Sequence, residues 1–189
     1  MTLSKTLFNF GRCAAAVLAA GLSVAGCGGN YDEDEKPAIN SSSRSNPLSS
    51  MIRITVFARV PSTPDTSFQV YRALTPSQRD EALSFVTNDE LLAAPTAPPR
   101  GMVFVYPDNR TLAFSGRNTL IDLDVVYAVG VGEGVGRIVD ITTIGAFQRN
   151  LAISSVPVKY VLMVKRGDLA RSGARVGDLL YVPINTPTE

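Results

Sequence analysis

The chain has 189 residues, with 18 Lys and Arg against 17 Asp and Glu, no histidine, no tryptophan and two cysteines. The lack of histidine excludes Ser-His-Asp and Cys-His catalysis, histidine-ligated zinc and haem, and the usual general base near neutral pH. The balanced charge gives no basic surface for nucleic acid, so no nucleic-acid partner is expected.

The first 26 residues have the pattern of a lipoprotein signal peptide. Lys5 and Arg12 supply positive charge, and an apolar run from Cys13 to Gly26 ends in Ser-Val-Ala-Gly before Cys27, which resembles a bacterial lipobox. This run is too short for a membrane-spanning helix, which needs about 20 residues. The sequence predicts cleavage before Cys27 and lipid on its sulfur, so the protein is anchored to a membrane without crossing it. The alternative is an ordinary signal peptide, which needs no cysteine at its cleavage site.

Export by this route changes the composition of the mature chain. Cys13 leaves with the signal peptide and Cys27 carries the lipid, so the mature domain has no disulfide and no thiol nucleophile. Removal of Lys5 and Arg12 leaves 16 basic residues against 17 acidic ones. Gly28 stands where inner-membrane retention would use Asp, which favours the outer membrane, facing the periplasm, in a host with two membranes.

The segment that follows, 27–50, is predicted to be the lipidated cysteine and an unfolded tether. It is polar and nearly free of large apolar residues, so it cannot bury enough surface to fold. Its acidic run Asp32–Glu35 is interpreted as part of a solvated spacer.

Residues 51–189 are predicted to form a single, mostly β domain. Apolar and polar residues alternate from Ile52 to Val60, which is the period of a half-buried strand. Further segments rich in Val, Ile, Tyr and Phe are bounded by turn residues. Strands are expected at 52–60, 68–73, 102–106, 111–115, 121–129, 137–144, 156–164 and 179–182.

Two or three short helices accompany these strands. Thr75, with Pro next and Gln78 three residues on, forms a capping box. Thr87 to Glu90 has the pattern of a second capping box and predicts a second helix. A third helix is expected from Asp168 to Ser172. We expect a compact β-sandwich or barrel-like domain.

Two motifs suggest chemistry. The glycines from Gly130 to Gly136 lack the spacing of a dinucleotide or phosphate loop, so the run is interpreted as a hairpin turn, and no cofactor is predicted. Asp122 and Asp124 lie two apart in a predicted strand and share a face, and Asp140 in a neighbouring strand could complete a metal site. The alternative is a pair of ordinary surface carboxylates.

Two segments carry a family resemblance. GMVFVYP (Gly101–Pro107) and FSGRNTLIDLDVVY (Phe114–Tyr127) resemble the core signature of domain-of-unknown-function family 192. Three more segments fall in register, so that the resemblance covers about residues 68 to 183: Thr75–Phe85, Gly136–Ile141 and Lys159–Asp178.

The resemblance implies an exported, compact β domain with short helices and no established activity. It places Asn118 and Asp124 on the family's most characteristic polar positions, and Arg117 where Lys is common. Ser115 and Gly116 depart from the Trp-Met pair that is frequent in the family. A purely structural alternative is that Asn118 caps a turn and Asp124 satisfies backbone amides.

The leading functional hypothesis is a lipid-anchored, non-catalytic binding or accessory module. Arg117, Asn118 and Asp124 would form the polar face of a ligand site, for a small polar ligand or an envelope protein. The first alternative is a carboxylate- or metal-dependent enzyme that uses Asp122, Asp124 and Asp140 on envelope or sugar substrates. The second is a structural protein of the envelope.

Overall fold

The computed structural model describes residues 43–59 and 66–183, which belong to one compact unit. The predicted signal peptide, Cys27 and the tether as far as residue 42 lie outside the described residues. No helix in the described part of the chain is long and apolar enough to cross a membrane.

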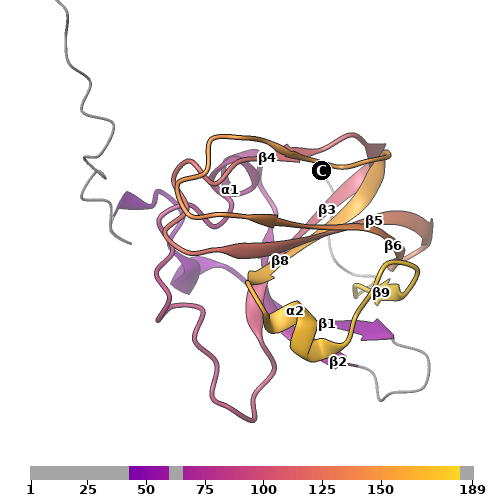
Figure 1. Ribbon diagram of the computed structural model, residues 1–189, viewed down its shortest axis with the longest axis horizontal. Helices are drawn as coiled ribbons and strands as arrows, with labels where there is room; N and C mark the ends of the chain where they lie inside the picture. The colour runs from indigo at the N-terminus through magenta and orange to yellow at the C-terminus, as the bar shows by residue number, and fades with distance from the viewer. Residues whose placement is uncertain (1–42, 60–65, 184–189) are drawn as a thin grey trace, which may run out of the picture. The chain divides into compact units, whose positions relative to one another are not determined.

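Strands dominate the described chain, as predicted (Figure 1). The strands are β1 (Arg53–Arg59), β2 (Thr66–Ala73), β3 (Arg100–Arg110), β4 (Ala113–Phe114), β5 (Leu123–Gly132), β6 (Val135–Ile144), β7 (Ala152–Ile153), β8 (Val158–Lys165) and β9 (Leu179–Tyr181). The helices are the 3-10 turn η2 (Leu48–Ser50), α1 (Pro76–Glu81) and α2 (Asp168–Ser172).

Seven of these strands form a closed barrel in the order β1-β2-β3-β8-β5-β6-β9. Neighbours are antiparallel except β2 and β3, which are parallel and are joined by the long connection 74–99. The short strand β9 closes the barrel because it pairs with both β1 and β6. The two-residue loop Glu133–Gly134 joins β5 to β6, so the glycine-rich run is the predicted hairpin turn.

The barrel strands carry two layers of buried side chains. One layer takes residues from all seven strands, such as Val56, Phe68 and Leu180, and fills the barrel interior. The other covers the outer face of β3, β5 and β8, with Phe104, Tyr127 and other apolar side chains of alternate parity. Because β3, β5 and β8 are buried on both faces, their sequences read as continuous apolar runs.

The outer layer is covered by the irregular parts of the chain. The connection 74–99 and the small β4–β7 ladder lie over it. Phe114 packs on Phe104 with ring centroids 5.2 Å apart, and the Tyr127 hydroxyl donates to the Ala152 carbonyl at 2.6 Å. In the view of Figure 1, α1 and β4 lie toward the top and α2 toward the bottom.

The predicted helices are confirmed at two places of three. Thr75 and Gln78 form the capping box of α1, and α2 ends at Gly173 in the left-handed conformation. At the third place, the Thr87 amide donates to the Glu90 carboxylate as in a capping box, but the Thr87 hydroxyl donates to the same carboxylate, and the backbone forms turns without a helix. So short a segment before Pro95 gains too few helical hydrogen bonds to offset the cost of nucleation.

Strand extents differ from the prediction at the β4–β7 ladder. The strand expected at 111–115 shortens to the two residues of β4, and no strand was predicted at its partner β7. Ladders this short rest on tertiary contacts, so they leave no periodic pattern.

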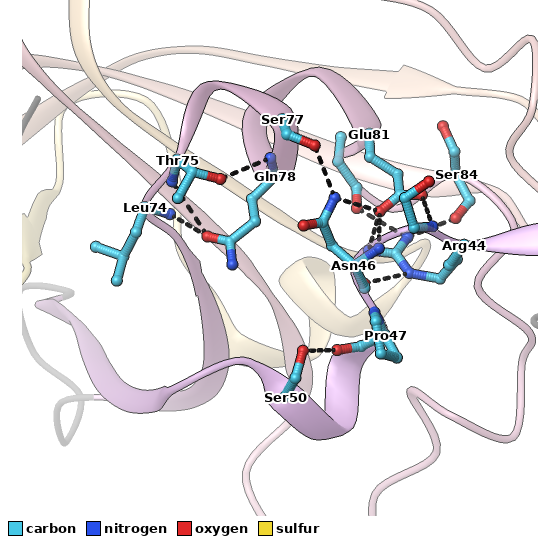
Figure 2. Close-up of polar contacts among 12 residues, drawn as sticks. Arg44, Asn46, Pro47, Ser50, Leu74, Thr75, Ser77, Gln78, Glu81 and Ser84 are labelled. Carbon is cyan, nitrogen blue, oxygen red and sulfur yellow. Dashed lines mark hydrogen bonds and ion pairs between the residues drawn. The ribbon is translucent and has the colours of Figure 1, made fainter.

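Residues 43–50 differ from the tether prediction, because they pack against the domain. The Arg44 side chain is 1% exposed, and Leu48 and Met51 are buried in the outer layer. Figure 2 shows Arg44 and Asn46 meeting Glu81 at the end of α1. The polar composition of this segment did not predict the attachment, because the attachment depends on hydrogen bonds that one buried guanidinium, that of Arg44, donates.

Candidate functional site

A cavity of about 450 Å³ opens in the outer layer, beside α1. Apolar side chains, most of them buried or half-buried, form its floor and walls, and polar and charged side chains lie around them. The apolar set includes Leu83, Leu112, Phe114, Leu123, Ile144 and Met163. The polar and charged set includes Arg79, Asp80, Arg117 and Asn118.

A tight turn places Arg117 and Asn118 at this cavity. The Thr119 amide donates to the Gly116 carbonyl at 2.9 Å, which closes the turn. A side chain at position 116 would put its Cβ 2.1 Å from the Gly145 carbonyl oxygen, so only glycine fits there. Arg117 is exposed and Asn118 half-buried.

The turn is also fastened to the opposite wall of the cavity. The Asn118 carbonyl accepts a 2.7 Å hydrogen bond from the Phe85 amide. Ala82 and Phe85 have φ angles of 47° and 61°, an unfavourable region for residues with a side chain. Arg44 holds the same segment, donating to the carbonyls of Ala82 at 3.0 Å and Ser84 at 2.5 Å.

Tyr106 lines the cavity and has cation–π contacts with two arginines, of which only Arg79 lines the cavity. The guanidinium carbons of Arg79 and Arg110 are 5.5 and 5.3 Å from the centroid of its ring. Burial raises the pKa of Tyr106, while the two guanidinium groups act in the opposite direction. Tyr106 is therefore a neutral aromatic group under positive charges, a typical cation–π arrangement.

The structure separates the three residues predicted to bind a ligand. Arg117 and Asn118 line the cavity, but Asp124 does not. Asp124 neighbours the cavity-lining Leu123 on β5, so its side chain has the opposite parity. It accepts hydrogen bonds from the Gly167 amide at 2.9 Å and the Thr143 hydroxyl at 3.3 Å. This is the structural role that the sequence left open for it.

The three aspartates of the metal hypothesis have separate environments. Asp122 accepts from the Ala146 amide at 2.9 Å and pairs with Arg166 at 3.2 Å, and these contacts lower its pKa. Asp140 lies opposite Tyr127 in the β5–β6 ladder, whereas Asp124 lies opposite Thr143. Across the described ranges, no three His, Cys, Asp or Glu side chains form a group that could hold a metal ion.

Comparison with known proteins now identifies the family. The model of DUF192, described as an uncharacterized ACR, matches residues 58–182. The chain belongs to the DUF192 family.

Two solved structures resemble this DUF192 chain, each with a TM-score of 0.58. One is a candidate transcription regulator of Sinorhizobium meliloti, 26% identical, with 70% of this chain and 95% of that chain covered. The other is a protein of unknown function from Novosphingobium aromaticivorans, 25% identical, with 71% and 89% covered. A search of curated proteins finds no match.

The DUF192 match contains the whole cavity but not all of its support. Every residue that lines the cavity falls within 58–182, whereas Arg44 and Leu48 lie before it. The sequence missed Arg79 and Tyr106 as site residues, because only the packing of α1 against β3 brings them to the turn of Arg117. Arg79 lies in the family-like segment Thr75–Phe85 and Tyr106 in the family-like segment Gly101–Pro107, and the resemblance gave neither residue a role.

Proposed function

We propose that this DUF192 protein is a lipid-anchored, extracytoplasmic, non-catalytic module that binds a small ligand in the cavity beside α1. The observation that carries the proposal is the cavity itself: about 450 Å³, with an apolar floor and a few polar groups at its rim. Small-molecule sites have this size and this division between apolar walls and orienting polar groups.

A binding role agrees better with the residues present than a catalytic one. The chain has no histidine, and its two cysteines, Cys13 and Cys27, lie outside the residues that the structure describes. The hydroxyl and carboxylate groups at hand, such as Ser115 and Asp80, therefore lack the bases that activate nucleophiles most often. Nucleic acid is not proposed as the ligand, because the chain has almost equal numbers of acidic and basic residues.

Thermal melting with a panel of metabolites tests binding in the cavity. A ligand at 100 times its Kd should stabilise the wild type by about 2.7 kcal/mol, because it binds only the folded state. Ala113→Phe, which places a ring at the cavity wall, should abolish the shift, and Val131→Phe on the exposed end of β5 should retain it. A panel without any shift, or a shift that survives Ala113→Phe, contradicts the proposal.

The proposed anchor has its own test in a bacterial host. Cys27→Ala should move the protein from the membrane fraction to the soluble fraction, since the lipid chains supply the affinity for the bilayer. Cys13→Ala, within the predicted signal peptide, is the matched control and should leave fractionation unchanged. Mass spectrometry of the N-terminal peptide would detect the lipid, and an unmodified Cys27 would refute the anchor.

A further inference from the structure

We infer that the ligand of this cavity is a small amphipathic carboxylate, whose acid group lies at the rim beside Arg117 and Asn118 and whose apolar body occupies the floor. The inference rests on the proposed function and names the class of ligand. Three features of the cavity lead to it: its charge, the geometry of its donors and the character of its floor.

The charges at the cavity match one negative charge. Arg79 and Arg117 contribute two positive charges and Asp80 one negative charge, which leaves an excess of one positive charge. A monoanion balances this excess. A cation would be repelled, and a dianion such as a phosphate monoester would leave a negative charge unmatched in a partly apolar site.

The donors suit a planar acid group. A guanidinium presents paired N–H groups in the geometry that a carboxylate accepts, and an amide side chain adds further donors. Arg79 lies with its guanidinium carbon 5.5 Å from the centroid of the Tyr106 ring, a contact that fixes the group in place. Arg117 and Asn118 are neighbours in the turn that Gly116 makes possible, so both are carried on one rigid support.

The floor suits an apolar body rather than a sugar or another polar group. Leu83, Ile144 and Met163 line the cavity and belong to the core of the outer layer. Phe114 lines it as well and is held by its ring contact with Phe104. A polar body on these side chains would lose its hydrogen bonds to water without replacement, whereas each methylene buried here should tighten binding about fourfold.

Calorimetric titration of the mature chain without its lipidated cysteine, residues 28–189, with three probes of equal length tests the inference. The probes are octanoate, 1-octanol and octylamine, all below their aggregation concentrations. Octanoate should bind about tenfold more tightly than octanol, since a hydrogen bond to a charged group contributes more than a neutral one. Octylamine should bind most weakly, and hexanoate should bind about 15-fold more weakly than octanoate because it lacks two methylenes.

Two variants assign the preference to the rim. Arg117→Gln should bring octanoate to within about twofold of octanol and leave octanol unchanged, because only the charged contact is lost. Asn118→Asp, nearly the same size, should reduce octanoate binding and improve octylamine binding. Arg175→Gln, on an exposed arginine that does not line the cavity, is the control and should behave as wild type.

The outcomes separate this inference from the proposed function. If octanol binds as tightly as octanoate, or if Arg117→Gln keeps the preference for octanoate, the carboxylate class is wrong and the cavity remains a binding site. If octylamine binds most tightly of the three probes, the cavity prefers a cation and the carboxylate class is also wrong. If none of the three probes binds, while Ala113→Phe also leaves every melting shift unchanged, both the ligand class and the cavity function are refuted.

Discussion

Glu81 illustrates how neighbouring groups decide the charge of one carboxylate. Burial alone would raise its pKa, but hydrogen bonds from the Ser45 amide at 2.7 Å and from Asn46, together with the charge of Arg44, outweigh burial and lower it. Asp168 shows the opposite balance: burial raises its pKa, and Arg171 and Lys165 only partly oppose this. Two carboxylates in one small domain therefore respond to acid with opposite signs.

This difference predicts the pH dependence of stability. The pKa of Glu81 is lower in the folded state than in the unfolded state, so its contribution is complete above the unfolded pKa, about 4.3, and is lost as the pH falls through the folded pKa. Glu81→Gln should therefore flatten the loss of unfolding free energy on acidification below about pH 4.3. Urea denaturation at a series of pH values, followed by circular dichroism, measures this.

Asp168→Asn is the control of opposite sign. The folded pKa of Asp168 is raised, so its protonation favours the folded state as the pH falls through that value. Without this gain, Asp168→Asn should steepen the acid decline. Equal slopes for the wild type and both variants would contradict the assigned environments.

At the level of single residues, the sequence located part of the candidate site. The family resemblance singled out Arg117 and Asn118, and the structure presents them on a local turn that needs Gly116. Asp124 is equally prominent in the sequence but has a structural role. Its side chain lies on the face of β5 away from the cavity, where it accepts a hydrogen bond from the Gly167 amide. A sequence motif can single out polar residues, but the register of the strands decides which of these side chains lie at the same site.

Among the structural elements, α1 depends on residues before the DUF192 match. Its last residue, Glu81, accepts from the amides of Ser45 and Asn46, and Arg44 reaches past it to the Ala82 and Ser84 carbonyls (Figure 2). Segment 43–46 and the end of α1 are thereby joined through one buried cation and one nearly buried anion. The cavity wall 82–84 thus has a support that comes from outside the family region.

Substitution of Arg44 tests this support. Arg44→Ala removes the donor to the Ala82 and Ser84 carbonyls and the charged partner of Glu81, so it should reduce the unfolding free energy by about 2 to 4 kcal/mol. Arg44→Lys restores the charge without the fork of donors and should recover only part of this loss. Arg175→Ala, at an exposed arginine, is the control. A change below about 0.5 kcal/mol in Arg44→Ala urea titrations would place Arg44 among ordinary surface residues.

Elements with local signals were the predictable ones. The capping box of α1 needs only Thr75, Pro76 and Gln78, and the strands needed only their apolar runs. The similar motif at Thr87 forms only one of the two capping-box hydrogen bonds, from its amide to the Glu90 carboxylate, and that contact forms in a turn as well as in a helix. The attachment of segment 43–46 could not be predicted, because its partners lie 31 to 40 residues away in sequence.

For the molecule as a whole, the two buried layers require close approach between strands. Gly101 on β3 shows this most clearly, since a Cβ there would lie 2.1 Å from the Met163 carbonyl oxygen on β8. β8 pairs with both β3 and β5 at the centre of the sheet, so it cannot shift without disturbing both. A disturbance of the contact between Gly101 and Met163 should therefore affect the packing of both the barrel interior and the outer layer.

Paired glycine substitutions test this packing. Gly101→Ala should reduce the unfolding free energy by about 2 kcal/mol or more, because the added methyl meets backbone atoms that cannot move aside. Gly132→Ala is the matched control at the open end of β5, where the added methyl would have its nearest contact at 3.9 Å. In urea titrations, the unfolding free energy of Gly101→Ala should be lower than that of Gly132→Ala by most of this amount. Equal unfolding free energies would show that β3 and β8 can move apart at little cost.

The closed barrel itself was only partly predictable. Mostly β composition and short helices follow from the patterns along the chain, but the sequence left sandwich and barrel open. Closure depends on β9, only three residues long, which pairs with β1 and β6. Such pairing is set by contacts between distant parts of the chain, and periodicity carries no information about them.

The place at which segment 43–46 attaches also determines how a mechanical load would travel through the molecule. If Cys27 is fixed in a bilayer, tension on the domain enters the described structure before β1, at Arg44. There it meets the Ala82 and Ser84 carbonyls and Glu81 before it reaches any strand of the barrel. Tension would therefore act on the Ala82 and Ser84 carbonyls, which belong to the wall of the cavity, before it acts on the strands.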